Sequence, residues 1–272
     1  MLGDNVYYLS KVNKELKFLS NSEIRLRILV DLYNGPLKIK DIARHSLLSY
    51  SSISSNLHRL CHEGFVEKIH NSFRLTNLGL IYISVLMDFY DSISIISRFS
   101  DFWLDHDINS LSMNNLNKLS SLEGSKLIKC NSTDIYKTHK EFKRIFKDSK
   151  HLKVIFPYWH PEYPKLIRRL ILKGVDVELI VPKNILDNFV KDIGKDVVKT
   201  GMDQGNFTMK YLDEHIRIAL AISNKFISIG LFKIDGTYDQ NRLLLSDKEK
   251  AINWGLNVYN SFDEHAVCLD TF

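Results

Sequence analysis

The chain has 272 residues, of which 44% are hydrophobic and 25% charged, and these values predict a globular protein of two modest domains. Its formal net charge is +5, and residues 1–80 carry eleven Lys and Arg against seven Asp and Glu, so most of the positive excess lies near the N-terminus. Three widely separated cysteines argue against a disulfide framework or a zinc site, and no apolar run approaches the ~20 residues that span a bilayer. We therefore expect a cytoplasmic protein without membrane contact, metal or cofactor.

The first 80 residues predict a domain that begins with three helices. The first helix covers Ser22 to Tyr33, where apolar residues recur at helical spacing, and Asn34-Gly35-Pro36 ends it. A short second helix surrounds Ile39 to Ala43. A tight connection then leads to a third helix, from about Tyr50 to Glu63. This order is that of a helix-turn-helix.

The third helix has one narrow apolar stripe, made by Ile53, Leu57 and Leu60. Its other side carries small hydroxyl residues, a histidine and an arginine. Serine is a mediocre helix former when exposed, whereas arginine contacts guanine bidentately in a major groove. We expect these residues to contact DNA: Ser51, Ser52, Ser55, His58 and Arg59.

Two short alternating segments follow, Phe65 to Ile69 and Phe73 to Leu75, around a turn-like tip. A helix-turn-helix followed by a basic hairpin is the order of a winged helix. We expect Lys68 and Arg74 on this hairpin to hold the DNA backbone or the minor groove. The alternative is a three-helix domain that binds another protein.

A connecting segment, residues 81–130, begins within a helix predicted from Asn77 to Trp103. This helix holds too many apolar residues for one solvated helix, so it must bury more than one face. Packing against a second copy of the chain would give a homodimer able to bind two half-sites of DNA, while packing within the chain remains an alternative. The polar, Asn- and Ser-rich stretch after Trp103 is typical of a domain linker.

Residues 131–272 predict an α/β domain with a mixed sheet, so the whole chain has an α+β fold. Strands are expected at 152–156 and 175–181, and a hairpin is formed by 216–222 and 227–231. Helices are expected at 161–173, after Pro182, and at about 247–262.

Chemistry is concentrated in two loops of this second domain. The loop 157–164 follows a strand, which is where open α/β sheets place ligands, and the loop 235–242 is polar. Their candidate effector-binding residues are Tyr158, His160, Tyr238, Asp239 and Arg242. The alternative is that both loops are structural corners shaped by Pro and Gly.

With these residues identified, the chain resembles the archaeal winged-helix regulators typified by the methanogen regulator of filament formation and methanogenesis genes. The resemblance extends over nearly the whole chain and is most specific at HPEYP (His160 to Pro164), at FISIGLFKIDGTYDQNR (Phe226 to Arg242) and at Trp254-Gly255. It implies a transcription factor with a signal-responsive C-terminal domain that is similar to the phospholipase D fold.

A phospholipase-D-like fold raises the possibility of phosphodiester hydrolysis, for which the family pattern is H-x-K-x-x-x-x-D. His151 and Lys153 match its start, but Tyr158 occupies the Asp position, and His215 is followed by no matching Lys. Metal binding by His58 and His62 is equally incomplete, because Cys61 points about 100° away from His62.

We therefore predict a non-enzymatic transcriptional regulator that binds double-stranded promoter DNA and responds to a small molecule or signal. The alternatives are a nonspecific chromatin-type DNA-binding protein and, less favoured by the residues, a phosphodiesterase-like enzyme.

Overall fold

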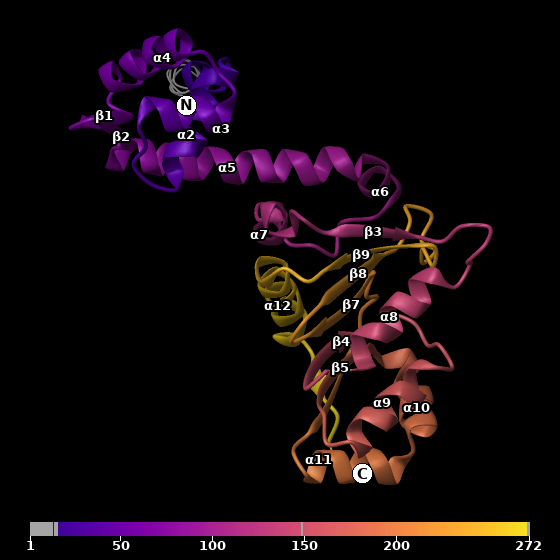
Figure 1. Cartoon of the computed structure of the whole chain (residues 1–272). Coiled ribbons are helices and arrows are strands. Elements are labelled where there is room, and N and C mark those ends of the chain that lie inside the picture. Colours follow the sequence, from indigo (N-terminus) through magenta and orange to yellow (C-terminus); the bar gives the residue numbers. More distant parts are fainter. Residues whose placement is uncertain (1–12, 14–15, 148, 271–272) are drawn as a thin grey trace, which may run out of the picture. The chain divides into compact units, whose positions relative to one another are not determined.

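The computed structural model describes residues 13, 16–147 and 149–270 (Figure 1). They form two compact units, one that ends at Phe89 and one that begins at Tyr90. The division predicted from the sequence, at residues 80 and 130, remains a prediction. The α+β fold with a mixed sheet is confirmed.

The first unit has the element order of a winged helix-turn-helix. Ser22 caps the helix that begins at Glu23 by accepting a hydrogen bond from the Arg25 N–H, and Ser49 caps the helix that begins at Tyr50 by accepting from the Ser52 N–H. Leu47 turns the chain between the second and third helices in the left-handed region, at φ 57°. The elements are α2 (Glu23–Tyr33), α3 (Ile39–Ser46), α4 (Tyr50–His62), β1 (Val66–Ile69) and β2 (Ser72–Leu75).

The core of the first unit is built from one apolar side of each helix. Ile28, Ile42 and Ile53 are fully buried, one from each of α2, α3 and α4, as the helical spacing predicts. The hairpin closes this core through Val66. Its strands pair with Ile69 opposite Ser72, which leaves a turn of two residues.

Helix α5 (Asn77–Arg98) is shorter than predicted, because Phe99 separates it from α6 (Ser100–Asp105). Among the described residues, α5 is the one helix long and apolar enough to cross a membrane by length and composition, with a mean hydropathy of 1.5 over 18 residues. The expectation that no apolar run approaches this length is wrong here, because polar residues such as Asp88 and Asp91 are too few to lower the mean.

The second unit contains an eight-stranded mixed sheet in the order β10-β6-β5-β4-β7-β8-β9-β3. Strands β4, β5 and β6 are parallel, and the other pairs are antiparallel. The strands are β3 (Lys126–Lys129), β4 (His151–Ile155), β5 (Asp176–Pro182), β6 (Phe207–Leu212), β7 (Ile218–Ser223), β8 (Ile227–Leu231), β9 (Arg242–Ser246) and β10 (Val267–Cys268).

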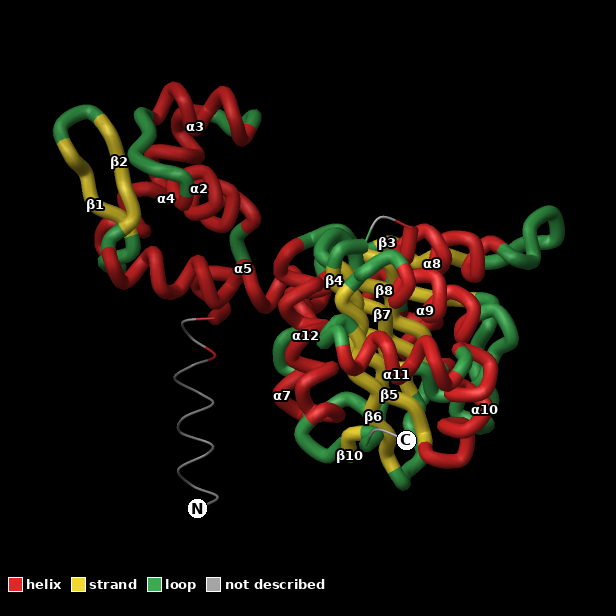
Figure 2. Tube along the Cα trace, turned by 90° about the horizontal axis from the view of Figure 1, so that it is seen from below, coloured by secondary structure: helices red, strands yellow, loops and turns green. Residues whose placement is uncertain are grey.

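Helices cover both faces of this sheet (Figures 1 and 2), and alternate residues of the strands pack on each. In β4, Val154 faces one core and Ile155 the other. One face is covered by α8 (Lys137–Lys147), α9 (Tyr163–Leu172), α10 (Lys183–Ile193) and α11 (Lys195–Asp203). The other is covered by α6, α7 (Met113–Leu116), a 3-10 helix, η1 (Leu119–Leu122), and α12 (Glu249–Asp263).

The stretch expected as a linker after Trp103 contains α7 and η1 and packs on the sheet. Leu111 and Leu122 are buried in it, and the indole N–H of Trp254 in α12 donates to the carbonyl of Asn115 at 2.9 Å. The sequence did not predict this packing, because isolated leucines in a polar stretch do not indicate which surface they pack against.

We predict that Gly79→Ala destabilises the first unit by about 3 kcal/mol, the upper end of the usual cost of overpacking. A Cβ at Gly79 would lie 2.0 Å from the carbonyl oxygen of Phe65, which is a backbone atom and has little freedom to move. Thermal unfolding followed by far-UV circular dichroism measures the loss. Ser84→Ala, on the exposed side of the same helix, should cost less than about 0.5 kcal/mol. Equal stability of the two variants would contradict this packing.

Candidate nucleic-acid interface and ligand pocket

Helix α4 presents its polar side to solvent. Ser51, Ser55, His58 and Arg59 are exposed, whereas the apolar stripe opposite them is buried, as predicted. Ser52 is half-buried, and its hydroxyl accepts from the Ser49 hydroxyl at 2.9 Å within the helix cap. The Ser51 hydroxyl also lies 3.1 Å from the Ser49 hydroxyl, so both serines take part in the cap, and Ser51 remains exposed together with Ser55, His58 and Arg59.

Positive charge accumulates beside this polar side. The pKa of Arg25 in α2 is lowered by burial and by the nearby charge of Arg59, so two like charges are held near each other. Arg25 is oriented by its own Nε–H, which donates to the Phe18 carbonyl at 2.7 Å. A polyanion placed against α4 would relieve this repulsion.

The two predicted contact residues of the hairpin, Lys68 and Arg74, differ in whether they already have a charged partner. Lys68 is exposed. Arg74 lies directly opposite Glu67 in the neighbouring strand, and its Nε donates to that carboxylate at 2.7 Å. The charge of Arg74 is thus partly neutralised within the hairpin, which the sequence did not predict.

Sequence reasoning missed several exposed residues that border α4. Lys40 and Arg44 lie on the solvent side of α3, while Leu47 and Tyr50 are 89% and 60% exposed around the turn. Helix α3 was interpreted from its apolar spacing alone. Lys40 and Arg44 occupy the polar positions between those apolar residues, and this pattern could have placed both on the exposed side of the helix.

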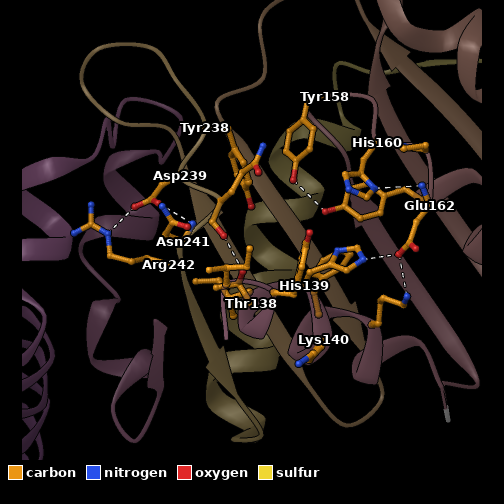
Figure 3. A pocket seen from close by; sticks show the side chains of 18 residues that line it. Thr138, His139, Lys140, Tyr158, His160, Glu162, Tyr238, Asp239, Asn241 and Arg242 are labelled. Carbon is orange, nitrogen blue, oxygen red and sulfur yellow. Dashed lines mark hydrogen bonds and ion pairs between the residues drawn. The ribbon is translucent and has the colours of Figure 1, made fainter. Parts of the chain in front are cut away.

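The second unit contains a cavity of about 750 Å³, drawn in Figure 3. All five predicted effector residues line it, because the loop after β4 and the loop before β9 end at the same edge of the sheet. A third wall comes from α8 and the residues before it, which sequence reasoning did not identify. The additional residues are Thr138, His139, Lys140, Phe142 and Lys143.

Three tyrosines form one wall of the cavity. The Tyr158 and Tyr163 hydroxyls are 3.0 Å apart, and the ring centroids of Tyr158 and Tyr238 are 4.4 Å apart. Burial raises the pKa of all three, so their hydroxyls stay protonated even above the ordinary tyrosine pKa of about 10 and can donate hydrogen bonds. Gly230 in β8 makes room for this wall, since a Cβ there would lie 2.2 Å from the Tyr238 hydroxyl.

Charged side chains form a second wall beside the tyrosines, where the His160 and Tyr163 ring centroids are 4.6 Å apart. The Glu162 carboxylate is 2.5 Å from His139 Nε2 and accepts from Lys143 Nζ at 2.9 Å (Figure 3). These two hydrogen bonds, with Lys143 contributing most, lower the pKa of Glu162 to about 2. His160 Nδ1 accepts the backbone N–H of Glu162 at 3.2 Å, and burial lowers the pKa of His160. This wall therefore offers a fixed carboxylate and adaptable nitrogen groups.

Asp239 and Arg242, both predicted as effector residues, are bonded to each other. Arg242 Nε donates to Asp239 at 2.6 Å, and Asp239 is only 2% exposed. Figure 3 shows Arg242 pointing away from Tyr158 and His160. These two residues line the cavity but are also engaged in structural pairing.

The residues weighed for phosphodiester hydrolysis are not brought together. His151 lies at the start of β4, where its Nδ1 is 3.1 Å from Asp176, and Lys153 pairs with Glu178. His215 lines a separate, smaller cavity of about 260 Å³. Within residues 13, 16–147 and 149–270, no group of three His, Cys, Asp or Glu side chains is placed to hold a metal ion.

The fold and these sites define a class of protein with a winged-helix unit followed by a mixed-sheet unit that contains a ligand-sized cavity. Residues 13–94 match the model of the N-terminal domain of methanogenesis regulatory protein FilR1, and residues 135–265 match the model of its middle domain. The two models together match more than three quarters of the chain. The chain belongs to the FilR1 family.

Over 260 residues the chain is 25% identical to methanogenesis regulatory protein FilR1 of Methanothrix harundinacea (strain 6Ac). The match covers 94% of this chain but 58% of that protein, so the chain spans less than two thirds of its relative's length.

Among solved structures, the archaeal chromatin protein TrmBL2 is similar with a TM-score of 0.43 and 12% identity, over 89% of this chain and 92% of that one. Phosphatidylserine synthase of Haemophilus influenzae Rd KW20 is similar with a TM-score of 0.42 and 15% identity, over 53% and 40%. Both scores are too low to support an argument about fold or function.

We predict that Tyr158→Phe makes the pH dependence of stability less steep above pH 10. Tyrosines ionise near pH 10 in the unfolded chain. Because burial raises the pKa of Tyr158, the folded chain keeps the proton that the unfolded chain loses, and the free energy of unfolding falls as the pH rises. Each such tyrosine contributes about 1.4 kcal/mol per pH unit to that fall.

Urea unfolding followed by tryptophan fluorescence measures this slope, since Trp103, Trp159 and Trp254 all lie in the second unit. The Tyr158→Phe slope should be smaller by about that amount. Identical slopes for the two proteins would show that Tyr158 ionises equally in both states.

Proposed function

We propose that the chain is a DNA-binding transcriptional regulator whose second unit responds to a small molecule. The observation that carries the first part is the exposed side of α4, where Ser51, Ser55, His58 and Arg59 stand opposite a fully buried stripe. A helix with this division can enter a major groove without uncovering its own core. Membership in a family named for a regulatory protein supports the proposal.

In this proposal Arg59 contacts a base or a phosphate, and the serines approach the DNA without holding the helix away. Lys68 on the hairpin contacts the backbone, while Arg74 does so only if it leaves Glu67. Lys40 and Arg44 of α3 add sequence-independent attraction to phosphates. The alternative function is nonspecific, chromatin-type binding of DNA. It relies on the same positive charges but does not require Arg59 to contact a base.

The second part of the proposal rests on the cavity of the second unit. Its volume of about 750 Å³ lies within the usual range for small-molecule sites, roughly 300–1,000 Å³. Its walls combine aromatic rings, neutral hydroxyl donors and a fixed carboxylate, which can orient a polar ligand. We propose no catalytic step there, because the His and Lys weighed for phosphodiester hydrolysis lie elsewhere. A phospholipase-D-like fold for this unit and a cytoplasmic location also remain proposals.

We further propose that α5 forms part of a homodimer interface. Ile81 and Val85 are 61% and 65% exposed on this apolar helix, and burying them against the same helix of a second copy would remove both from water. A dimer would also place two α4 helices on one DNA molecule.

We predict that Arg59→Ala weakens binding to promoter DNA by about 1–3 kcal/mol without unfolding the first unit. Fluorescence anisotropy with a promoter fragment, across a salt series and against scrambled competitor, measures the change. Arg169→Ala is the matched control, since Arg169 is an exposed arginine of α9 in the other unit. If Arg59→Ala binds as tightly as the unchanged protein, α4 is not the recognition helix. Weak binding that ignores sequence would favour the chromatin-type function.

We predict that replacing Ile81 and Val85 together by Glu converts a dimer to a monomer, because two negative charges on each copy would be buried against those of the other copy. Sedimentation velocity of the full chain measures the mass. The control places Glu at Leu172, which is 63% exposed on α9, and should leave the mass unchanged. A monomeric unchanged protein would end the dimer proposal, and binding to lipid vesicles would assign α5 to a membrane surface instead.

A further inference from the structure

Helix α6 is fastened to the segment between β8 and β9. The backbone N–H of Asp107 donates to the Phe232 carbonyl at 2.8 Å, and the N–H of Ile234 donates to the Asp105 carbonyl at 3.1 Å. These bonds fix the residues that follow α6 against a segment more than a hundred residues later in the chain.

A group of four side chains reinforces this attachment; His106 and Asp239 are buried, Arg242 is half-buried and Asp105 is exposed, and we call these four residues the clasp. The side chain of His106 has no exposed area; its Nδ1 lies 2.5 Å from the Phe102 carbonyl and its Nε2 lies 3.1 Å from the Asp239 carboxylate. Arg242 spans the group, because Nε donates to Asp239 and another guanidinium nitrogen donates to Asp105 at 2.7 Å.

The Asp239 carboxylate depends on this whole set of partners. Burial opposes its ionisation, but hydrogen bonds from Arg242 and from the Asn241 backbone N–H lower its pKa below the usual range. A buried charge that loses one partner is strongly destabilised, so the clasp has few intermediate arrangements.

The same segment forms a wall of the cavity. Tyr238, Asp239, Asn241 and Arg242 all line it, and the Thr138 hydroxyl of α8 donates to the Gln240 carbonyl at 2.7 Å. A ligand that moves the 238–242 segment therefore moves groups that hold α6.

We propose that the clasp couples occupancy of the cavity to the α5–α6 segment, with His106 and Arg242 as positioning residues. Helix α5 runs without a break from Asn77 to Arg98, and a single residue separates it from α6, so a change at α6 acts on a helix that continues into the first unit. Coupling of this kind requires contacts that differ between two states, and we expect the contacts of the clasp to be the ones that differ. This inference rests on the proposed regulatory function.

The test uses the full chain with Asp239→Asn, which keeps the size of the side chain and removes its charge. Amide hydrogen exchange should become at least about tenfold faster in residues 99–107 and also increase in α5. Affinity for promoter DNA should change by about fivefold or more. Asp213→Asn is the control, because Asp213 pairs with Lys183 on the surface and should alter neither quantity.

Exchange that stays unchanged at residues 99–107 would show that the clasp does not hold α6. Faster exchange there, with unchanged exchange in α5 and unchanged DNA affinity, would overturn the coupling. If the unchanged protein binds no DNA selectively, the proposed regulatory function is wrong. The rate of amide hydrogen exchange in α5 still shows whether the clasp is coupled to that helix. Should Asp239→Asn fail to fold, Asp105→Asn serves instead, since Asp105 is 53% exposed and loses one bond from Arg242.

Discussion

The second unit depends on the Asp239 carboxylate, a charge that the fold removes from water. Such a group is tolerated only when its lone pairs are satisfied, and here Arg242, the Asn241 backbone and His106 satisfy them. These partners come from the β8–β9 segment and from the chain just after α6. The requirement therefore determines both the shape of the cavity wall and the attachment of α6.

The cavity is stabilised by comparable constraints on its other sides. The tyrosine wall needs Gly230 beneath it, because any side chain there would occupy the position of the Tyr238 hydroxyl. The charged wall needs Glu162 between Lys143 and His139, so that α8 and the start of α9 are joined by ion pairs. A ligand entering this cavity meets groups that already hold secondary-structure elements together, which makes it a reasonable place from which to change their arrangement.

The first unit follows a simpler principle, in which one apolar side of each helix forms the core and the other side is free for a partner. At α4 the buried stripe and the serine-rich side can both be read from the sequence, because the spacing of residues along a helix determines which side of the helix each residue faces. The exposed side of α4 that we propose to contact DNA could therefore be identified without a structure. The pairing of Arg74 with Glu67 could not, since it depends on the register of two strands.

The sequence by itself determined the winged-helix order of the first unit, the mixed α/β character of the second and the two loops that carry the cavity, because these follow from local periodicity and from turn-forming residues. It did not identify β3, α8, β6 or β9. It also identified Tyr158, His160, Tyr238, Asp239 and Arg242 as candidates in two loops, and the tertiary structure showed that both loops line one cavity. Tertiary structure alone decided that α8 completes the cavity, that residues after Trp103 pack on the sheet, and that His106 meets Asp239. The last contact joins residues 133 positions apart, and spacing within a sequence carries no information about which distant side chains satisfy a buried charge.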